Sequence, residues 1–387
     1  MNYNSCNSCQ KRLLKIRVVS NNQCNKKTVM ETKGISFISP IEGDMLHGKD
    51  GEVINGALET IVSVNAPEGS SISINGEVAT TIEDVFIAKL SFKNYKNTIE
   101  ALDNHTGEKK TITVYWLPNF ANKYRLSIDD NIWFLRDLRK DNPASLFDNA
   151  YLAFLKDVHD TYGTKIHLNL FYQTEGFDLS ELSDQYKAEW KANADWLRLS
   201  FHALGEFPDQ PYIDARYNKV KADCTLVDEQ IKRFAGKSSM GPFTTIHWGE
   251  ATKEGARAVK DCGYNGLLGY FGLYEEIPGV SYYLQGDKSK RVEKRFVWKD
   301  DKTDMVFVRT SIVIDREKID TILPQLDAYK VNNDMPPYLD LLVHEQYYYP
   351  DYFNYQPDYR EKIITAVQWA VDNGYEPAFL ADCVFEK

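Results

Sequence analysis

The order of apolar and polar residues divides the chain into two parts with different periods. Between residues 35 and 117, short runs alternate apolar and polar side chains, as in residues 59–64 and 111–116. Gly, Asn, Asp and Pro separate these runs. Strict alternation predicts half-buried strands, and several strands at this spacing favour a two-layer all-β unit. We therefore expect residues 35–117 to form a small β-sandwich.

Beyond Pro118, apolar strand-like runs alternate with segments of helical period. Strand-like runs include residues 165–172, 305–315 and 338–345, and helical segments include residues 253–262 and 358–373. Such alternation predicts βα units around a parallel sheet. We expect residues 118–387 to be one α/β catalytic domain. Residues 1–34 are polar and lack either period, so we expect a disordered leader there.

Composition narrows the possible partners. The chain has 387 residues, 43% of them hydrophobic, and a net charge of -10. Because no basic stripe could meet phosphates, nucleic acid is excluded as a partner. No apolar run is long enough to span a membrane. Charged residues interrupt any signal-peptide core in the leader, so the sequence alone predicts a cytoplasmic protein, or a periplasmic one if the true start differs.

Polar residues end several of the predicted strands. Asp129 and Asp130 follow residues 124–128, and His202 follows residues 196–201, with Glu206 four positions later. In parallel α/β folds the carboxyl ends of strands meet at one face, so these side chains can converge. We expect Asp130, His202 and Glu206 to bind one divalent metal ion, with Asp129 free to move protons.

Two further predicted strands end in histidine. His247 follows Thr-Thr-Ile and precedes Trp248, and His344 follows Leu-Leu-Val. Their position at strand ends favours the mouth of the fold over its core. We expect His344 and His247, together with Asp129, to transfer protons.

Here the chain resembles the polysaccharide deacetylase family. The Asp-Asp of the first motif matches Asp129 and Asp130, the first His of the second motif matches His202, and the late Leu-x-x-His type motif matches His344. The resemblance implies a distorted (β/α)7 barrel. It covers roughly residues 120–387, and the strand spacing of residues 35–117 separately predicts that the sandwich before it is immunoglobulin-like. It also implies Asp129 as base, His344 as acid, and Asp130 and His202 as metal ligands.

Two departures from that family bear on the chemistry. Glu206 stands where the family has a second His, and the family's Arg-x-Pro-x-Gly segment has no counterpart. A set of two carboxylates and one imidazole suits zinc first, with iron, manganese or nickel as alternatives.

Aromatic and basic residues near the strand ends suit an anionic oligosaccharide. Aromatic faces pack on sugar rings, and arginine binds carboxylates. The expected substrate contacts are Trp248, Tyr270, Tyr347, Arg198 and Arg309, with Arg316 as a further candidate anchor.

A closer resemblance concerns phrases such as Leu-Ser-Ile-Asp-Asp, Leu-Asn-Leu-Phe-Tyr and Ser-Phe-His. They are similar to the unclassified deacetylase-like oligosaccharide dehydratases of ulvan-utilisation systems. This resemblance implies removal of water from a non-reducing-end glucuronic or iduronic acid, giving a 4,5-unsaturated uronate. A metal-dependent carbohydrate deacetylase and a non-catalytic sugar-binding protein are the alternatives.

Overall fold

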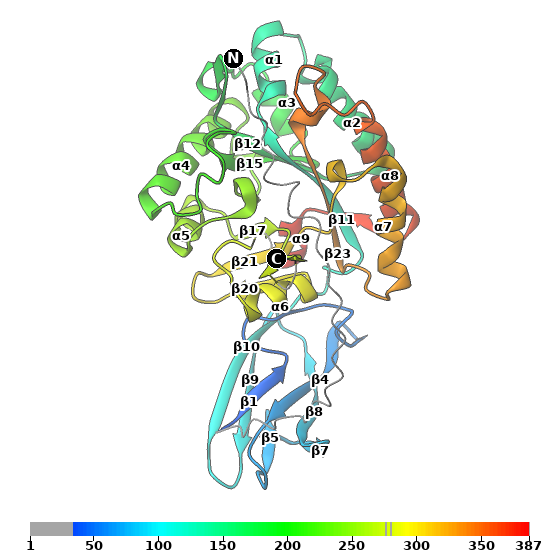
Figure 1. Ribbon diagram of the computed structural model, residues 1–387. Coiled ribbons are helices and arrows are strands. Elements are labelled where there is room, and N and C mark those ends of the chain that lie inside the picture. The colour runs from blue at the N-terminus through cyan, green and yellow to red at the C-terminus, as the bar shows by residue number, and fades with distance from the viewer. Residues whose placement is uncertain (1–33, 275–276, 279–280, 387) are drawn as a thin grey trace, which may run out of the picture.

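The structure is a computed structural model, and it describes residues 34–274, 277–278 and 281–386. Figure 1 shows an all-β part at the bottom of the view and a larger α/β part above it. The leader expected at residues 1–34 lies almost entirely outside the described residues. Among the described residues, no helix is both long and apolar enough to cross a membrane.

The all-β part consists of two sheets that enclose one core. The first has the order β1-β4-β8-β7 with β3 on β4, and the second has the order β2-β10-β9-β5-β6. Inward side chains such as Val62, Phe86, Ile99 and Val114 share one buried cluster. The bounds are β1 Ser36–Ser39, β2 Met45–Leu46, β3 Glu52–Ile54, β4 Ala57–Asn65, β5 Ile72–Ile74, β6 Glu77–Val78, β7 Thr80–Ile82, β8 Val85–Phe92, β9 Lys96–Asp103 and β10 Lys109–Trp116.

Strand β8 shows why these residues form a sandwich. Its burial alternates along most of its length, as expected for a strand with one face on the core and the other in water. The two-sheet arrangement agrees with the expected all-β unit, whereas its immunoglobulin-like character stays a prediction.

The α/β part contains two larger sheets. The first is parallel, with the order β15-β12-β11-β23-β22 and β24 on β11, and the second has the order β16-β17-β21-β20. Their bounds are β11 Lys123–Asn131, β12 Ile166–Phe171, β15 Leu197–Ala203, β16 Phe243–Thr244, β17 Gly266–Gly269, β20 Val297–Asp300, β21 Met305–Arg309, β22 Ile312–Val313, β23 Tyr338–His344 and β24 Glu376–Pro377. Two small hairpins pair β13 Gln173–Thr174 with β14 Phe177–Asp178, and β18 Leu273–Tyr274 with β19 Ile277–Pro278.

Helices cover the outside of these sheets, with α4 and α5 on one side and α2, α7 and α8 on the other (Figure 1). The central strands are buried along both faces, and β12 has no exposed residue. Continuous apolar strands of this kind are typical of parallel sheets covered by helices. The helices are α1 Trp133–Asp141, α2 Ala150–Tyr162, α3 Lys187–Ala192, α4 Tyr217–Phe234, α5 Lys253–Cys262, α6 Asp287–Arg295, α7 Ile319–Val331, α8 Tyr359–Asp372 and α9 Leu380–Val384.

The hydrogen-bonded strands of the described chain form no closed sheet, so the expected barrel is not confirmed. Thr310 and Ser311 separate β21 from β22, and a single bridge between Leu199 and Met240 links β15 to the segment before β16. Pro242 stands immediately before β16 and has no N–H to donate. The α/β part is therefore a mixed arrangement in which the two larger sheets are separate.

The all-β part packs against the amino ends of the parallel strands. Met45 and Tyr115 share a buried cluster with Tyr338, the first residue of β23. Arg291 of α6 forms an ion pair with Asp44, which has no exposed surface. The all-β part therefore leaves the carboxyl ends of the parallel strands uncovered.

Candidate active site

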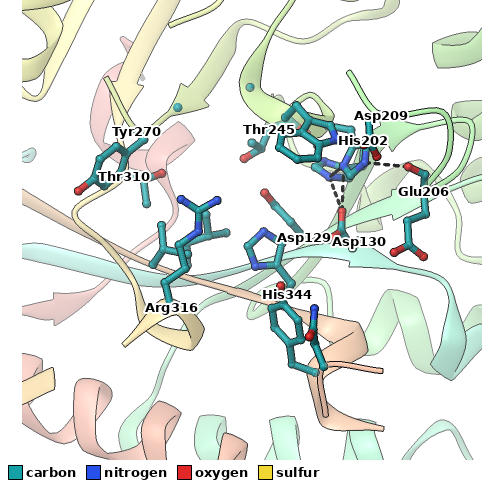
Figure 2. A pocket seen from close by; sticks show the side chains of 18 of the residues that line it. Asp129, Asp130, His202, Glu206, Asp209, Thr245, Tyr270, Thr310, Arg316 and His344 are labelled. Atoms are coloured by element: carbon teal, nitrogen blue, oxygen red, sulfur yellow. Dashed lines mark hydrogen bonds and ion pairs between the residues drawn. The ribbon is translucent and has the colours of Figure 1, made fainter. Parts of the chain in front are cut away.

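A cavity of about 410 Å³ opens at the carboxyl ends of β11, β15 and β23. Figure 2 shows side chains from these ends pointing into it. The lining residues that were expected from the sequence are Asp129, Asp130, His202, Glu206, His247, Trp248, Tyr270, Arg316, His344 and Tyr347. One cavity therefore contains most of the residues that were predicted to bind metal, transfer protons or contact the substrate.

Asp130, His202 and His247 form a compact group of metal-ligating atoms. Asp130 Oδ1 lies 2.9 Å from His202 Nε2 and 3.1 Å from His247 Nδ1. The two ring nitrogens are 3.1 Å apart, and all three ligand atoms lie within 4.8 Å of one another. All three residues are buried.

The backbone at Asp130 explains how two adjacent aspartates reach one cavity. Successive side chains of a strand point to opposite faces. Here the pairing of β11 with β12 shifts register between Ile128 and Asn131, and Asp130 has a φ of 63°. This irregularity turns the Asp130 carboxylate toward the cavity that Asp129 also faces.

The hydrogen bonds of the two histidines fit a cation at this group. Nδ1 of His202 lies against the carbonyl oxygen of Thr245, and Nε2 of His247 lies 3.2 Å from that of Glu206. A carbonyl can only accept, so each of these nitrogens carries the N–H. In neutral rings, the other two nitrogens then direct lone pairs toward each other and toward Asp130. His202 lies at the end of β15, whereas His247, predicted to end a strand, begins the 3-10 helix His247–Gly249 after β16. These two imidazoles and a carboxylate suit a divalent ion.

The charges of the group support that assignment. Burial alone would raise the pKa of Asp130, but hydrogen bonds from His202 and His247 hold it well below its ordinary value. Burial would lower the pKa of His202, but the nearby carboxylates of Asp129 and Asp130 raise it. The carboxylate is thus ionised, and a divalent ion would replace the proton that His202 otherwise holds.

The structure places Glu206 differently from the sequence hypothesis. Its carboxylate accepts a hydrogen bond from Tyr352 at 3.0 Å, and it does not belong to the group of three. Strand β15 ends at Ala203, so the spacing between His202 and Glu206 is not that of one helix face. His247, expected to transfer protons, is the third member of the group that could hold a metal ion.

Asp129 lies beside this group and is almost fully buried. Asn169 Nδ2 donates to Asp129 Oδ1 at 2.5 Å, and Ser200 Oγ donates to Asn169 Oδ1 at 2.5 Å. Burial raises the pKa of Asp129 even though His202 and His344 lower it. A carboxylate with a raised pKa, fixed by a neutral amide, suits a general base.

His344 is the register partner of Asp129 on the neighbouring strand β23. Asp315 Oδ2 accepts from His344 Nδ1 at 2.8 Å and from the His344 backbone amide at 2.5 Å. Burial would lower the pKa of His344, but the Asp315 charge and hydrogen bond raise it to about 10. The ring is therefore protonated at neutral pH and suits a general acid.

Sequence reasoning missed Asp315 and Asn169 as partners of the proton-transferring groups. Asp315 ends an apolar run as Asp129 does, so its position at a predicted strand end was the available signal. Asn169 lies inside the apolar run of β12, where a buried amide among Leu residues marks a polar interior.

The three candidate arginines lie in different places. Arg198 donates to the carbonyl of Ser238 at 2.7 Å, near the amino end of β15. Arg309 donates to the carbonyl of Glu293 at 2.8 Å, and neither arginine lines the cavity. Arg316 does line it and reaches toward it beside His344 (Figure 2). In the described part of the chain, no carboxylate lies within ion-pair distance of Arg316.

Exposed aromatic side chains surround the mouth of the cavity. Trp248 is 43% exposed, Tyr270 41%, Phe207 72% and Phe353 77%. Large apolar side chains gathered at one exposed site mark a binding surface. Flat aromatic faces above polar groups suit sugar rings.

Comparisons with known proteins give distant structural similarities. No protein-family model matches, and no curated protein matches. A structure described as a polysaccharide deacetylase from Mycobacterium smegmatis has 11% identity and a TM-score of 0.35, covering 67% of this chain and 94% of that one. Agd3, described as a novel carbohydrate deacetylase, has 9% identity and a TM-score of 0.38, covering 85% of this chain and 70% of that one.

A maltogenic amylase from S. marinus is also similar, with 11% identity and a TM-score of 0.22, covering 92% of this chain and 61% of that chain. All three TM-scores are below 0.5, so these similarities assign neither a family nor an activity.

Proposed function

We propose that this protein is a metal-dependent carbohydrate-active enzyme, an oligosaccharide dehydratase. Its substrate would be an ulvan-type oligosaccharide with glucuronic or iduronic acid at the non-reducing end, and its product a 4,5-unsaturated uronate. The observation that carries the proposal is Arg316, a cation without an ion-pair partner in the described chain that lines the cavity of the Asp130 group.

Arg316 supplies the recognition of an acidic sugar. A guanidinium binds a carboxylate through two parallel hydrogen bonds, which fixes orientation as well as charge. The protein carries a net charge of -10, so an anionic substrate needs a local cation of this kind. The aromatic side chains at the mouth would hold the sugar rings while Arg316 holds the carboxylate.

Asp129 and His344 supply the proton transfers. Asp129 would take the proton from C5, and the electron pair of that bond would form the C4–C5 double bond. The C4–O bond breaks as His344 gives its proton to the departing oxygen, which leaves as water. Asp315 holds the His344 ring in place and keeps it protonated.

Asp130, His202 and His247 would hold one divalent ion, with zinc expected first and iron, manganese or nickel as alternatives. Such an ion would stabilise the negative charge that develops on the substrate during elimination.

Deacetylation is the second candidate, because the same groups suit hydrolysis. Asp129 would take a proton from the attacking water, and His344 would protonate the sugar oxygen as the acetyl group leaves. Completion of the metal group by a second histidine favours this reading. A neutral acetylated sugar would leave the Arg316 guanidinium without a partner, however, and this favours the uronate substrate.

One assay separates the candidates. The protein is incubated with oligosaccharides that end in a uronic acid, and the ultraviolet absorbance of unsaturated uronate and the release of acetate are measured together. We expect absorbance to rise without acetate, and Asp130→Asn to abolish the rise. Acetate release without absorbance would select hydrolysis, and sugar binding without either product would select a binding protein.

A further inference from the structure

A pair of cysteines lies outside the proposed active site, between helices α4 and α5. Cys224 is fully buried in α4, and Cys262 is the partly exposed last residue of α5. The two sulfur atoms and a carboxylate oxygen of Asp228 lie within 4.8 Å of one another. The reaction proposed above uses none of these groups.

Two hydrogen-bond donors lie near the Cys262 sulfur. Lys221 Nζ lies 3.4 Å from it, and Thr225 Oγ1 lies 3.8 Å from it. Both donors lie on α4: Lys221 is about one turn before Cys224, and Thr225 is the next residue after it. A hydrogen bond from the Cys224 thiol, together with Thr225 and Lys221, lowers the pKa of Cys262 to about 7 despite burial. Burial instead raises the pKa of Cys224 well above its ordinary value.

These two environments assign different roles to the two thiols. A partly exposed sulfur beside an ammonium group is the thiolate and nucleophile, whereas a buried sulfur stays protonated and unreactive toward solvent. We propose that Cys262 and Cys224 form a peroxide-reactive pair, in which Cys262 is oxidised first and Cys224 then closes a disulfide between α5 and α4.

The reaction balances with hydrogen peroxide as the oxidant. The Cys262 thiolate attacks one peroxide oxygen, an S–O bond forms, the O–O bond breaks, and hydroxide leaves. The Cys224 sulfur then attacks the Cys262 sulfur, an S–S bond forms, the S–O bond breaks, and the second oxygen leaves as water with the thiol proton. Two sulfurs are oxidised, and the two peroxide oxygens are reduced, one to hydroxide and one to water.

A metal site is the competing explanation for two thiols and a carboxylate. One oxygen of Asp228 already accepts a hydrogen bond from Tyr264 at 2.6 Å. The Lys221 ammonium beside Cys262 would repel a bound cation, whereas it stabilises a thiolate. The charges around the pair therefore favour oxidation chemistry over metal binding.

Peptide mapping of the full-length protein tests the proposal. After brief treatment with hydrogen peroxide and alkylation of the remaining thiols, we expect a cross-linked peptide pair containing Cys224 and Cys262. Cys262→Ser should abolish this product. Cys224→Ser should leave Cys262 as a sulfenic acid that dimedone traps. Cys383, a buried cysteine in α9, is the internal control and should remain unmodified.

A rate measurement tests the role of Lys221. At pH 7, Lys221→Met should slow alkylation of Cys262 by iodoacetamide by about two- to threefold, because the Lys221 charge adds to the hydrogen bonds from Cys224 and Thr225 that lower the pKa of this thiol. Lys232→Met, on the same helix, should leave this rate unchanged. The proposal is overturned if Cys262 reacts no faster than Cys383. It is also overturned if the purified protein holds a zinc ion that Cys262→Ser loses and Asp130→Asn retains.

Discussion

At the scale of single residues, His344 combines a buried position with a charge that the fold maintains. Asp315 accepts from both its ring and its backbone amide, and the pKa of His344 is raised to about 10. This raised pKa means that the pair stabilises the folded protein most below the ordinary histidine pKa. That contribution is lost as pH rises through about 10.

We expect His344→Gln to lower turnover by at least about 100-fold, the lower bound for loss of a general acid. Gln keeps the size and hydrogen-bonding ability of the ring but cannot supply a proton at neutral pH. Metal content should stay nearly unchanged, whereas the melting temperature should fall, because the buried Asp315 carboxylate would lose its charged partner. In the parent protein, kcat/KM should fall as pH rises through about 10. Residual turnover in the variant should lack that alkaline decline, and turnover within a few-fold of the parent would exclude His344 as the acid.

Arg316 allows a test of substrate charge. Arg316→Gln should lower kcat/KM for uronate-ended oligosaccharides by about 10- to 100-fold, since a charge-assisted hydrogen bond contributes roughly 1.5–3 kcal/mol. Reduction of the substrate carboxyl to an alcohol should remove most of the difference between parent and variant.

Arg309→Gln is the matched control, because Arg309 donates to the carbonyl of Glu293 and lies outside the cavity. It should leave kcat/KM for the same substrates unchanged. Equal losses in both variants would mean that Arg316 is not the carboxylate anchor.

Most residues that line the cavity could be predicted from the sequence, but their contacts with one another could not. Strand-end polarity brought Asp129, Asp130, His202 and His344 into one hypothesis, and all of them line the cavity. The presence of His247 rather than Glu206 beside Asp130 and His202 depends on how the chain turns after Ala203, where β15 ends. A spacing of four residues cannot reveal that turn, since it has the same form in a helix and in a loop.

At the scale of elements, a buried carboxylate joins strand β23 to helix α1. Glu345 accepts the backbone amides of Ile132 and Trp133 at 2.6 and 2.9 Å, and of Phe134 at 2.6 Å. Helix α1 begins at Trp133 and has no side-chain cap from its own N-cap residue. Glu345 therefore satisfies amides that a helix start leaves open, directly after the segment that carries Asp130.

We expect Glu345→Ala to lower the free energy of unfolding by about 2–4 kcal/mol, because three backbone amides at the start of α1 would lose the carboxyl group that accepts from them. Metal affinity should also fall roughly 10- to 100-fold, since a partner that holds the ligand-bearing segment would be gone. Urea unfolding of the metal-free protein and metal titration measure the two effects separately.

Glu181→Ala is a suitable control, because Glu181 caps the short 3-10 helix Leu179–Glu181 from an exposed position. It should change the free energy of unfolding by no more than about 0.5 kcal/mol. A similar small change in Glu345→Ala would show that water replaces the carboxylate without cost.

The period of the sequence predicted strand and helix order better than sheet closure. The alternating runs of the first part and the βα succession of the second both appear in the structure. Closure of the sheet would need pairing between β15 and β16 and between β21 and β22. Neither pair is hydrogen-bonded, and β16 and β22 have only two residues each. Burial pattern determines which face of a strand is inside, but it does not determine how many ladder hydrogen bonds the strand makes.

At the scale of the whole molecule, the all-β part and the proposed active site lie at opposite ends of the parallel strands. Tyr338, at the amino end of β23, belongs to the core shared with Met45 and Tyr115, while His344 at its carboxyl end lines the cavity. The predicted division at residues 117 and 118 crosses this shared core, which includes Leu117 and Phe120. Sequence period could not indicate that packing, because its residues come from segments far apart in the chain.

The interface also contains a buried ion pair that offers a final prediction. Asp44 accepts from Arg291 Nε at 2.8 Å and lies 3.6 Å from Arg295 Nε, and it has no exposed surface. We expect Asp44→Ala to lower the free energy of unfolding by about 3–5 kcal/mol, because two arginines would be left without this buried carboxylate. Turnover per folded molecule should remain at the parent value, since the interface lies away from the cavity.

Lys89→Ala provides the comparison within the same all-β part, because the Lys89–Glu59 pair is solvent-exposed. Water and side-chain entropy offset most of the attraction in an exposed pair, so this variant should melt close to the parent. If Asp44→Ala lowers turnover per folded molecule as well as the free energy of unfolding, the all-β part contributes to the chemistry. If stability falls alone, the all-β part supports the fold from the amino ends of the strands while the opposite ends perform the reaction.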